Sequence, residues 1–297
     1  MPLIRKAIKI NKDQEKWLKS HPDFNFSKWI RKKLDETIEH ENIEKSKRKI
    51  KAIIVAAGHD KRIEPLNEDL PKCMLDIKGK TILDRQIDNL LSCGISDIAI
   101  VKGYKQETID VSNAKYYLNP DFEKNGIVSS LFFAEKEMDS DFIFLYSDIL
   151  FDKKLLIRLL KNKSDISLVV DLDWKERYKK RGIQPAGEVE LVKVKNGKII
   201  KIGKKISSKD VHGEFIGLAM FTKKGAENLK KTYKKAISKY KNKKFHESSS
   251  INKAYFTDII QEIIDNEYTV NSIDTYGEWM EIDTFEDYKR AWNLISD

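Results

Sequence analysis

Long apolar runs are missing from this 297-residue chain, and cysteine is scarce. No stretch approaches the roughly 20 apolar residues that a membrane-spanning helix needs. The first six residues, Met-Pro-Leu-Ile-Arg-Lys, lack the apolar core of a signal peptide. We therefore expect a cytoplasmic protein with no membrane segment.

The two cysteines, Cys73 and Cys93, fit neither a disulfide framework nor the spacing of a metal site. Cys73 follows Lys72, whose charge would stabilise a thiolate, but a small buried thiol is the favoured interpretation. No internal repeat or low-complexity tract stands out. With 40% hydrophobic and 35% charged residues, the composition is that of an ordinary lysine-rich globular protein.

The formal net charge of +9 is concentrated at one end of the chain. Residues 1–50 contain 14 Lys and Arg against 8 Asp and Glu, so most of the excess lies there. This asymmetry raises a question about the N-terminal segment rather than about the whole protein. A second lysine-rich run, Lys223–Lys244, has apolar residues at helical spacing and is interpreted as a solvated helix face.

The N-terminal segment is expected to be a separate module. Leu3–Ile10 alternates loosely between apolar and polar residues, as a half-exposed strand would. A helix capped by Asn11 or Asp13 follows, and Asn25 or Ser27 can cap a second helix. This order of strand, helix, turn and helix resembles a ribbon-helix-helix module of the kind found in small dimeric DNA-binding proteins.

The resemblance implies a homodimer whose paired strands direct Arg5 and Lys9 outward, where they would contact DNA. The favoured interpretation is a dimerisation or packing element whose charges keep it in solution. The charged stretch Glu39–Lys49 is a helical continuation or a linker. We expect residues 1–48 to form this module and its linker, and residues 49–297 to form the larger domain.

The larger domain alternates strand-like and helix-like segments. Buried strands are predicted at Ile53–Val55, Ile98–Val101, Tyr116–Leu118 and Phe142–Tyr146, and helices at Thr81–Cys93 and Val128–Met138. Further strands are predicted at 166–170, 188–194, 198–202 and 214–221, with a hairpin turn at Asn196-Gly197, and further helices at 257–264 and 284–294. The pattern predicts an α/β fold with a Rossmann-like, mostly parallel mixed sheet and helices on both faces.

One loop has the pattern of an anion-binding site. The first strand ends in Ala56-Ala57-Gly58, whose small side chains let backbone N–H groups approach an anion closely. Arg62 and Lys72 follow, with charges that neither burial nor helix capping requires. Because open α/β sheets bind their ligands at the carboxyl ends of strands, we expect a polyphosphate site here.

This loop resembles the signature of the nucleotidyltransferases that activate sugar phosphates, phosphocholine and phosphonates. The matching pattern is Ala56-Ala57-Gly58-x-x-x-Arg62-x-x-Pro65-Leu66, followed by Pro71-Lys72 and Leu75. It is neither a Rossmann G-x-G-x-x-G nor a P-loop. The likeness is closest to the phosphocholine and 2-aminoethylphosphonate cytidylyltransferases, and further matching motifs are Asn119-Pro120, Ser129-Ser130-Leu131, Tyr146–Phe151, Asp171–Trp174, Gly213–Leu218 and Trp279–Thr284. Asp60 departs from the family, which usually has a glycine there; it could point outward, cap the loop or join a metal shell.

The resemblance implies transfer of CMP from CTP to a small phosphonate or phosphate monoester: 2-aminoethylphosphonate, hydroxyethylphosphonate or phosphocholine. The attacking oxygen is already anionic, so no histidine base or serine nucleophile is required. Arg62, with Lys61, would hold the β- and γ-phosphates, and Lys72 would reach the α-phosphate. Asp148 and Asp283 would bind Mg²⁺, although each could instead be a helix cap or a surface acid.

The remaining candidates are assigned to the nucleotide and to the acceptor. The nucleotide-binding candidates are Ala56, Ala57, Gly58, Lys61, Gly103, Tyr104, Ser129 and Ser130. The acceptor candidates are Tyr146, Asp171, Trp174, Glu214 and Trp279, with Asp173 and Glu188 nearby. An aromatic wall with carboxylates suits choline or a primary amine; the alternative interpretation is that Trp174 and Trp279 are core aromatic residues. The choice of CTP over UTP or dTTP rests on the resemblance alone.

Two other functions remain open. A sugar-1-phosphate or inositol-phosphate nucleotidyltransferase would share the loop and the metal-binding aspartates. A DNA-binding regulator could use a degenerate transferase domain as a ligand sensor, with Asp60 as a sign of lost catalysis. The presence of Arg62, Lys72, Asp148 and Asp283 argues against the regulator.

Overall fold

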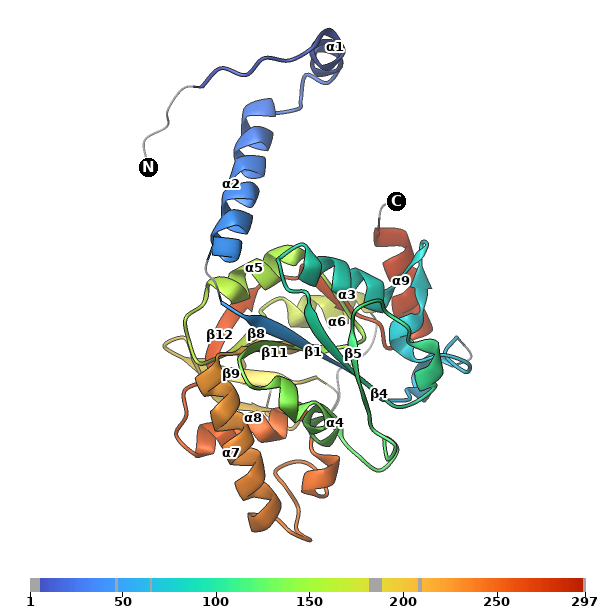
Figure 1. The fold of residues 1–297 in the computed structure, drawn as a ribbon, viewed down its shortest axis with the longest axis vertical. Coiled ribbons are helices and arrows are strands. Elements are labelled where there is room, and N and C mark those ends of the chain that lie inside the picture. The colour runs from blue at the N-terminus through green and yellow to red at the C-terminus, as the bar shows by residue number, and fades with distance from the viewer. Residues whose placement is uncertain (1–5, 46–47, 65, 182–188, 208–209, 296–297) are drawn as a thin grey trace. The chain divides into compact units, whose positions relative to one another are not determined.

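The chain divides into two compact units, residues 1–47 and residues 48–297, next to the boundary expected at residue 48. The computed structural model describes residues 6–45, 48–64, 66–181, 189–207 and 210–295 (Figure 1). Within these ranges, none of the helices combines the length and the apolar character that crossing a membrane would require.

The N-terminal unit contains two helices, α1 (Lys12–Ser20) and α2 (Phe26–Lys45). Asn11 and Gln14 cap α1 by accepting each other's backbone N–H groups, at 2.8 and 2.9 Å. Asn25 caps α2, because its side chain accepts the backbone N–H of Lys28 at 2.9 Å. Of the caps weighed from the sequence, the structure therefore uses the two asparagines.

The strand predicted at Leu3–Ile10 is not formed in the described part of this unit. Residues 6–10 are not in a strand, and residues 3–5 lie outside the described residues. The physical reason is that a strand needs a hydrogen-bonded neighbour, and the described N-terminal residues supply none.

A mixed sheet forms the centre of the larger unit. Its strands are β1 (Ile50–Ala56), β4 (Asp97–Lys102), β5 (Lys115–Leu118), β6 (Asp141–Tyr146), β8 (Ile166–Asp171), β9 (Leu191–Lys195), β10 (Lys198–Gly203), β11 (Gly213–Phe221) and β12 (Asn271–Thr275). Their order is β5-β4-β1-β6-β11-β8-β12-β10-β9. Strands β5, β4, β1 and β6 are parallel, while β11 is antiparallel to both of its neighbours, β6 and β8.

Helices cover both faces of this sheet (Figure 1). The helices α3 (Ile82–Leu91) and α5 (Lys153–Lys161) pack together on one face, and α4 (Ile127–Phe133), α7 (Lys223–Lys239) and α8 (Phe256–Asp265) pack on the other. The predicted α/β, Rossmann-like fold is confirmed. The strands run as expected because continuous β-branched runs such as Ile53–Val55 are buried from both sides.

The remaining elements lie around the sheet. They are the strands β2 (Asp76–Ile77), β3 (Lys80–Thr81), β7 (Ile149–Phe151) and β13 (Trp279–Glu281), the helices α6 (Trp174–Arg181) and α9 (Phe285–Leu294), and the 3₁₀ turns η1 (Lys61–Ile63), η2 (Lys72–Met74), η3 (Gln106–Thr108), η4 (Glu135–Glu137) and η5 (Ile251–Lys253). The expected hairpin turn joins β9 to β10, and Asn196 and Gly197 both have positive φ, 53° and 72°.

The helix predicted over Val128–Met138 is shorter than expected. It ends at Phe133, and the chain continues as the 3₁₀ turn η4. This turn buries Glu137, whose carboxylate accepts hydrogen bonds from Lys51 at 2.7 Å, Lys115 at 3.0 Å and Tyr117 at 2.6 Å. The spacing of apolar residues does not show that Glu137 binds Lys51, Lys115 and Tyr117, which are distant in the sequence, and it therefore predicted a longer helix.

An aromatic stack joins the sheet to α8. The ring of Phe256 is fully buried and lies 3.9 Å from that of Phe144 and 5.5 Å from that of Phe215, measured between centroids. These three residues come from α8, β6 and β11. The stack therefore fixes three elements relative to one another.

We predict that Phe256→Ala lowers the free energy of unfolding by about 3–5 kcal/mol, because it removes a buried ring and leaves a cavity. Urea-induced unfolding followed by circular dichroism measures the change. The matched control is Phe133→Ala, because Phe133 is 39% exposed and its truncation should cost less than about 0.5 kcal/mol. Equal effects of the two substitutions would contradict a stabilising role for the stack.

Candidate active site

The loop after β1 begins with tightly packed small residues. Ala56 and Ala57 are buried, whereas Gly58 has open space where a side chain would project. Gly103 packs against this loop, since a Cβ there would lie 2.5 Å from the carbonyl oxygen of Ala57. The backbone N–H of Tyr104 donates to the same oxygen at 3.0 Å. Gly103 and Tyr104 thus hold the loop in place through their contacts with the carbonyl oxygen of Ala57.

Asp60 caps the turn that follows. Its carboxylate accepts the backbone N–H of Arg62 at 3.0 Å and binds the Arg62 guanidinium at 2.7 Å and the Lys72 ammonium at 2.8 Å. Burial alone would raise the pKa of Asp60, but Arg62 and Lys72 outweigh it and hold that pKa well below its ordinary value. Of the three roles left open by the sequence, the structure shows the loop cap.

Lys72 lies at the centre of a buried ionic cluster. Its Nζ is 2.8 Å from Asp60 Oδ2, 2.9 Å from Asp148 Oδ2 and 2.8 Å from Asp283 Oδ1. Burial opposes the charge on Lys72, but the carboxylates around it raise its pKa well above the ordinary value. Arg62 Nη2 joins the cluster 3.0 Å from Asp283 Oδ1. The four residues predicted as catalytic or metal-binding therefore lie together.

The ribbon of β7 and β13 brings the two aspartates together. Glu281 pairs with Ile149 across this ribbon, and the backbone N–H of Ile282 donates to the carbonyl oxygen of Asp148 at 3.0 Å. Asp283 follows directly. It does not cap the last helix, because the side chain of Thr284 does so.

A third carboxylate that the sequence analysis missed belongs to this cluster. Oxygen atoms of Asp148, Glu281 and Asp283 lie within 4.8 Å of one another. Burial and the two neighbouring aspartates raise the pKa of Glu281 well above its ordinary value. Its signal in the sequence is the spacing of two from Asp283, which places both side chains on one side of an extended segment.

This donor set fits a divalent cation. All three side chains offer hard carboxylate oxygens, the ligands that Mg²⁺ takes in proteins. Asp148 Oδ1 is buried and has no hydrogen-bond partner among the described residues, so it is available as a ligand. A metal would also stabilise the close approach of three acidic groups.

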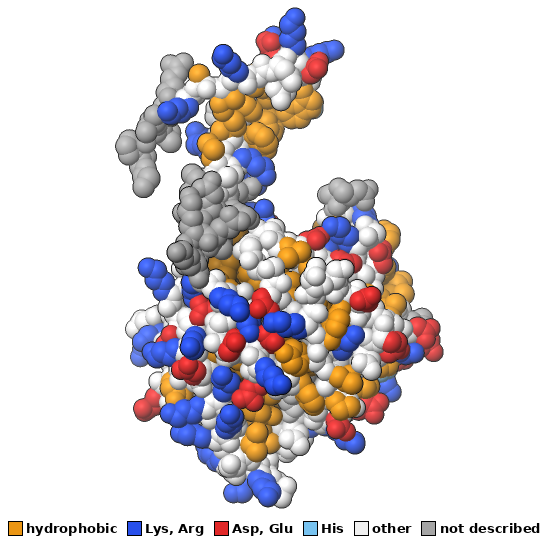
Figure 2. Space-filling model, viewed as in Figure 1, with side chains coloured by type: hydrophobic (Ala, Val, Ile, Leu, Met, Phe, Trp, Pro, Cys, Tyr) orange, Lys and Arg blue, Asp and Glu red, His pale blue; other side chains and the backbone are white. Residues whose placement is uncertain are grey.

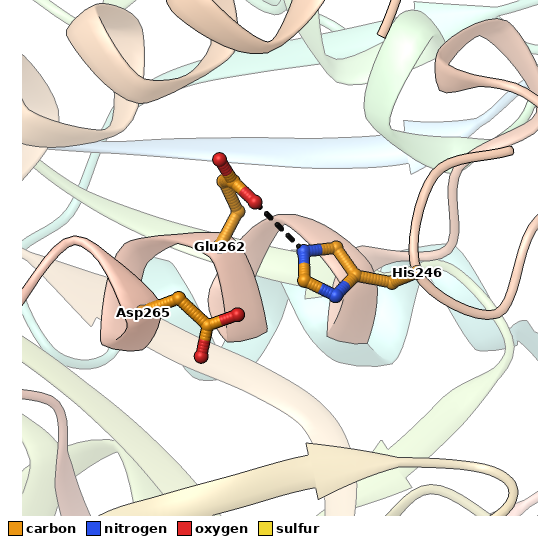
Figure 3. Close-up of side chains that lie close together, drawn as sticks. All are labelled: His246, Glu262 and Asp265. Carbon is orange, nitrogen blue, oxygen red and sulfur yellow. Dashed lines mark hydrogen bonds and ion pairs between the residues drawn. The ribbon is translucent and has the colours of Figure 1, made fainter. Parts of the chain in front are cut away.

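A second group of potential ligands, His246, Glu262 and Asp265, is satisfied without a metal (Figure 3). The carboxylate of Glu262 already accepts hydrogen bonds from Lys239 at 3.0 Å, Tyr240 at 2.9 Å and His246 at 2.9 Å. These partners link the end of α7 and the following loop to α8. The group is therefore a structural network.

A cavity of about 440 Å³ contains the ionic cluster, a size typical of small-molecule sites. The predicted residues that line it are Ala56, Gly58, Arg62, Lys72, Ser130, Tyr146, Asp148 and Asp283. The predicted residues that do not line it are Ala57, Lys61, Gly103, Tyr104, Ser129, Asp171, Trp174, Glu214 and Trp279. Ser129, for example, donates its hydroxyl to the carbonyl oxygen of Asn252 at 3.1 Å.

One part of the cavity wall consists of residues that the sequence analysis did not assign to the site. Lys204 Nζ lies 4.2 Å from the centroid of the Tyr255 ring and 4.0 Å from Glu190 Oε1. Tyr146 donates its hydroxyl to Glu190 Oε2 at 2.9 Å. Burial raises the pKa of Glu190 to about 7, against the opposing effects of Lys204 and Tyr146.

Glu247 fixes the position of Lys204. Its carboxylate accepts the backbone N–H groups of Lys204 at 2.7 Å and of Lys205 at 2.9 Å, just after β10 ends. No local motif in this lysine-rich sequence singles out Lys204. Its place in the cavity follows only from the tertiary fold.

Trp174, which was predicted to bind the acceptor, does not line the cavity. It is 5% exposed and packs in an apolar cluster with Tyr178, Val189, Leu191 and Ile206. The reason is that α6 begins at Trp174 and turns this side chain toward the residues around β9. The alternative interpretation, a core aromatic residue, fits the structure; Glu188 lies outside the described residues.

The sequence of this chain was compared with those of known proteins. A family model described as a MobA-like NTP transferase domain matches residues 52–188. CTP:phosphoglutamine cytidylyltransferase from Campylobacter jejuni is 32% identical over 250 residues, which cover 80% of this chain and 96% of that protein. Choline-phosphate cytidylyltransferase from Streptococcus pneumoniae is 31% identical over 106 residues, which cover 34% of this chain and 46% of that protein.

Solved structures share the fold. CTP:phosphocholine cytidylyltransferase from Streptococcus pneumoniae superposes with a TM-score of 0.62 at 22% identity, covering 84% of this chain and 100% of that chain. The inositol-1-phosphate CTP transferase from T. maritima gives a TM-score of 0.63 at 21% identity, covering 83% and 98%. Because a relative with 32% identity is matched over 96% of its own length, the chain belongs to the MobA-like NTP transferase family of nucleotidyltransferases.

Proposed function

We propose that the protein is a Mg²⁺-dependent cytidylyltransferase that transfers CMP from CTP to a small phosphate or phosphonate monoester. The observation that carries the proposal is the cluster in which Arg62 and Lys72 meet Asp148, Glu281 and Asp283 inside one cavity. Two relatives support the choice of CTP, since both are named as cytidylyltransferases.

The reaction requires positively charged side chains that stabilise the phosphates, and it does not require a general base to deprotonate the nucleophile. An oxygen of the acceptor attacks the α-phosphorus of CTP, a new P–O bond forms, and the bond to the bridging oxygen breaks so that pyrophosphate leaves. The nucleophile is anionic, so the main barrier is repulsion between two anions. Arg62 and Lys72 offer fixed cations to the triphosphate, and the pKa of Lys72 keeps it charged throughout.

Asp148, Glu281 and Asp283 would hold the Mg²⁺ ion. The ion would supply neutralisation of phosphate charge during the transfer. The support for this assignment is the buried, unpartnered oxygen of Asp148 and the mutual distance of the three carboxylates.

Lys204 is assigned to the acceptor's phosphate or phosphonate group. Among the described residues that line the cavity, it is the one lysine or arginine besides Arg62 and Lys72. It comes from the end of β10, whereas those two belong to the segment after β1. A separate cation is needed because two anionic substrates must bind close together.

The reaction is tested by pyrophosphate release. The protein is incubated with Mg²⁺, each of CTP, UTP, ATP, GTP and dTTP, and a panel of acceptors: phosphoglutamine, phosphocholine, 2-aminoethylphosphonate, hydroxyethylphosphonate, inositol phosphate and sugar 1-phosphates. We expect release with CTP and one of the first four acceptors. Release only with sugar 1-phosphates or inositol phosphate would establish the alternative enzyme, and no release with any pair would refute both.

We predict that Lys72→Ala lowers kcat by about 10²–10³-fold, because it removes a preorganised cation from the reacting phosphate. Steady-state rates of pyrophosphate release measure the effect. Circular dichroism and thermal melting separate lost catalysis from lost fold. The matched control is Lys235→Ala on the exposed face of α7, which should leave kcat unchanged. A Lys72→Ala rate close to that of the parent protein would remove Lys72 from the mechanism.

We predict that Lys204→Ala changes the KM for the acceptor, whereas Lys72→Ala changes kcat. The KM for the acceptor should rise by about 10-fold or more while the KM for CTP stays the same, because one charge-assisted contact to the acceptor is lost. Lys201→Ala, an exposed lysine of β10, is the control. A parallel rise in the KM for CTP would place Lys204 on the nucleotide instead.

We also propose that the N-terminal unit joins two copies of the chain. Helix α1 buries none of its residues, and Trp17, Trp29 and Leu34 are 48, 44 and 56% exposed. Figure 2 shows apolar side chains gathered on this unit. A unit of fewer than 50 residues rarely buries a sufficient core alone. A second copy would cover these exposed apolar side chains with its own and offer residues 6–10, which form no strand here, an identical segment to pair with.

Dimerisation is tested in the full-length protein. We expect the parent protein to be a dimer by light scattering, and Trp17→Glu combined with Trp29→Glu to be a monomer with unchanged turnover. Trp292→Glu, a 40% exposed tryptophan of α9, is the matched control and should stay dimeric. A monomeric parent protein would refute the proposal. Salt-sensitive binding to a specific DNA would add the function that the sequence analysis considered for this unit.

A further inference from the structure

Three of the predicted acceptor residues contact an arginine of the chain itself and do not line the cavity. Arg177 Nη2 lies 2.8 Å from Asp171 Oδ2 and 2.5 Å from Glu214 Oε2. The guanidinium carbon lies 3.9 Å from the centroid of the Trp279 ring. None of these four residues lines the cavity that contains the ionic cluster. An acceptor bound in this cavity would therefore contact other side chains.

Lys204 offers unused hydrogen-bond donors in the cavity wall. Within the described ranges its Nζ atom makes no hydrogen bond, and Glu190 Oε1 lies 4.0 Å away, beyond hydrogen-bond distance. Lys72 and Arg62, in contrast, already bind Asp283. An ammonium group with unused donors suits an incoming phosphate or phosphonate oxygen.

A close approach of Glu247 fixes the backbone at Lys204. The Glu247 carboxylate accepts the backbone N–H groups of Lys204 and Lys205. A Cβ at the preceding residue, Gly203, would lie 2.6 Å from Glu247 Oε1, and the three atoms nearest to it would all belong to the Glu247 side chain. The missing side chain at Gly203 therefore leaves the space in which the carboxylate reaches the backbone.

A buried aspartate in the first turn of α8 fixes Glu247 in turn. Asp258 is 2% exposed, and its Oδ1 accepts the backbone N–H of Glu247 at 2.9 Å. Its Oδ2 accepts the backbone N–H of Tyr255 at 3.0 Å and the hydroxyl of Ser248. These hydrogen bonds satisfy the buried carboxylate. Asp258 thereby holds both ends of the segment 247–255 against α8.

Tyr255 contacts the other end of Lys204. The Lys204 Nζ atom lies 4.2 Å from the centroid of the Tyr255 ring, which gives a cation–π contact. Asp258 therefore acts on Lys204 twice, on its backbone through Glu247 and on its ammonium group through Tyr255. A flexible lysine that is held in place before the acceptor arrives loses less conformational freedom on binding.

We propose that Asp258 and Glu247 are positioning residues of the acceptor site, which hold the ammonium group of Lys204 where the phosphate or phosphonate group of the acceptor binds. This inference rests on the proposed cytidylyltransferase function and extends its acceptor site to two residues that do not line the cavity. Because neither residue touches a substrate, their removal should weaken acceptor binding and leave the chemical step unchanged.

The test measures pyrophosphate release with CTP and the acceptor of the panel above that gives the highest kcat/KM. Glu247→Ala should raise the KM for the acceptor about 10-fold, because both hydrogen bonds to the backbone are lost, and Glu247→Gln, which keeps one acceptor oxygen, about 3-fold. Asp258→Asn should raise the same KM. In all three variants kcat and the KM for CTP should stay the same. The matched control is Glu227→Ala, an exposed acid of α7, which should behave like the parent protein.

Gly203→Ala covers the case in which the other variants do not fold. The added methyl group meets only the end of a flexible side chain, so it should displace the Glu247 carboxylate and raise the KM for the acceptor. Combined with Glu247→Ala, it should add nothing, because the atoms that it would meet are gone. Likewise, Lys204→Ala combined with Glu247→Ala should be no worse than Lys204→Ala alone, whereas a merely structural role would make the losses add.

The outcomes separate this inference from the function on which it rests. If Lys204→Ala raises the KM for the acceptor but the folded Glu247, Asp258 and Gly203 variants keep the parent value, the inference alone is refuted. A lower kcat or a raised KM for CTP in these variants would also refute it. An unchanged KM for the acceptor in Lys204→Ala refutes the assignment of Lys204 together with the inference. A parent protein that releases no pyrophosphate with any acceptor refutes the cytidylyltransferase function itself.

Discussion

The site depends on the ion pairs that the buried ammonium group of Lys72 forms with three aspartates. Asp60, Asp148 and Asp283 all lie within 2.9 Å of it, and they belong to three segments that are far apart in the sequence. Carboxylates so close to one another would be unstable without a cation between them. Lys72 therefore links the phosphate loop, the end of β6 and the segment after β13 into one structure.

Pairing of opposite charges also explains why this loop has Asp60 where the family usually has glycine, since Asp60 pairs with Arg62 and Lys72. In the proposed reaction the triphosphate brings several negative charges to Arg62 and Lys72. In the structure described here, Asp60 provides negative charge to both residues and also caps the turn η1, which contains Arg62. An acidic residue in the proposed phosphate loop is thus compatible with the proposed reaction, because its carboxylate holds Arg62 and Lys72 in place.

The sequence predicted the parts of the molecule that depend on neighbouring residues. Buried strands such as β1 and β6 were found because their apolar runs are continuous, and the turn at Asn196-Gly197 was found because few residues adopt positive φ. The strand expected at Leu3–Ile10 was not formed in its described part, because pairing depends on a partner strand. The site residues Arg62 and Lys72 were recognised from the spacing of a family motif.

The parts that the sequence could not predict depend on tertiary contacts. Lys204 is one of many lysines, and only its contacts with Glu190 and Tyr255 distinguish it. Trp174 was predicted to bind the acceptor but packs in an apolar cluster, because the sequence does not show which way α6 turns its first residue. Arg177 lies in a charged helical segment, where nothing indicates that its side chain is enclosed by Trp279 and two acids.

The long separation between the members of the ionic cluster has a consequence for the order of synthesis. Lys72 and Asp283 are 211 positions apart, and Asp283 directly follows the strand β13, which pairs with β7. Chains leave the ribosome from the N-terminus, so Lys72 is made long before Asp283. A nascent chain that ends before β13 has Lys72 together with Asp60 and Asp148, but it lacks Asp283. Assembly of this centre therefore waits for translation through residue 283.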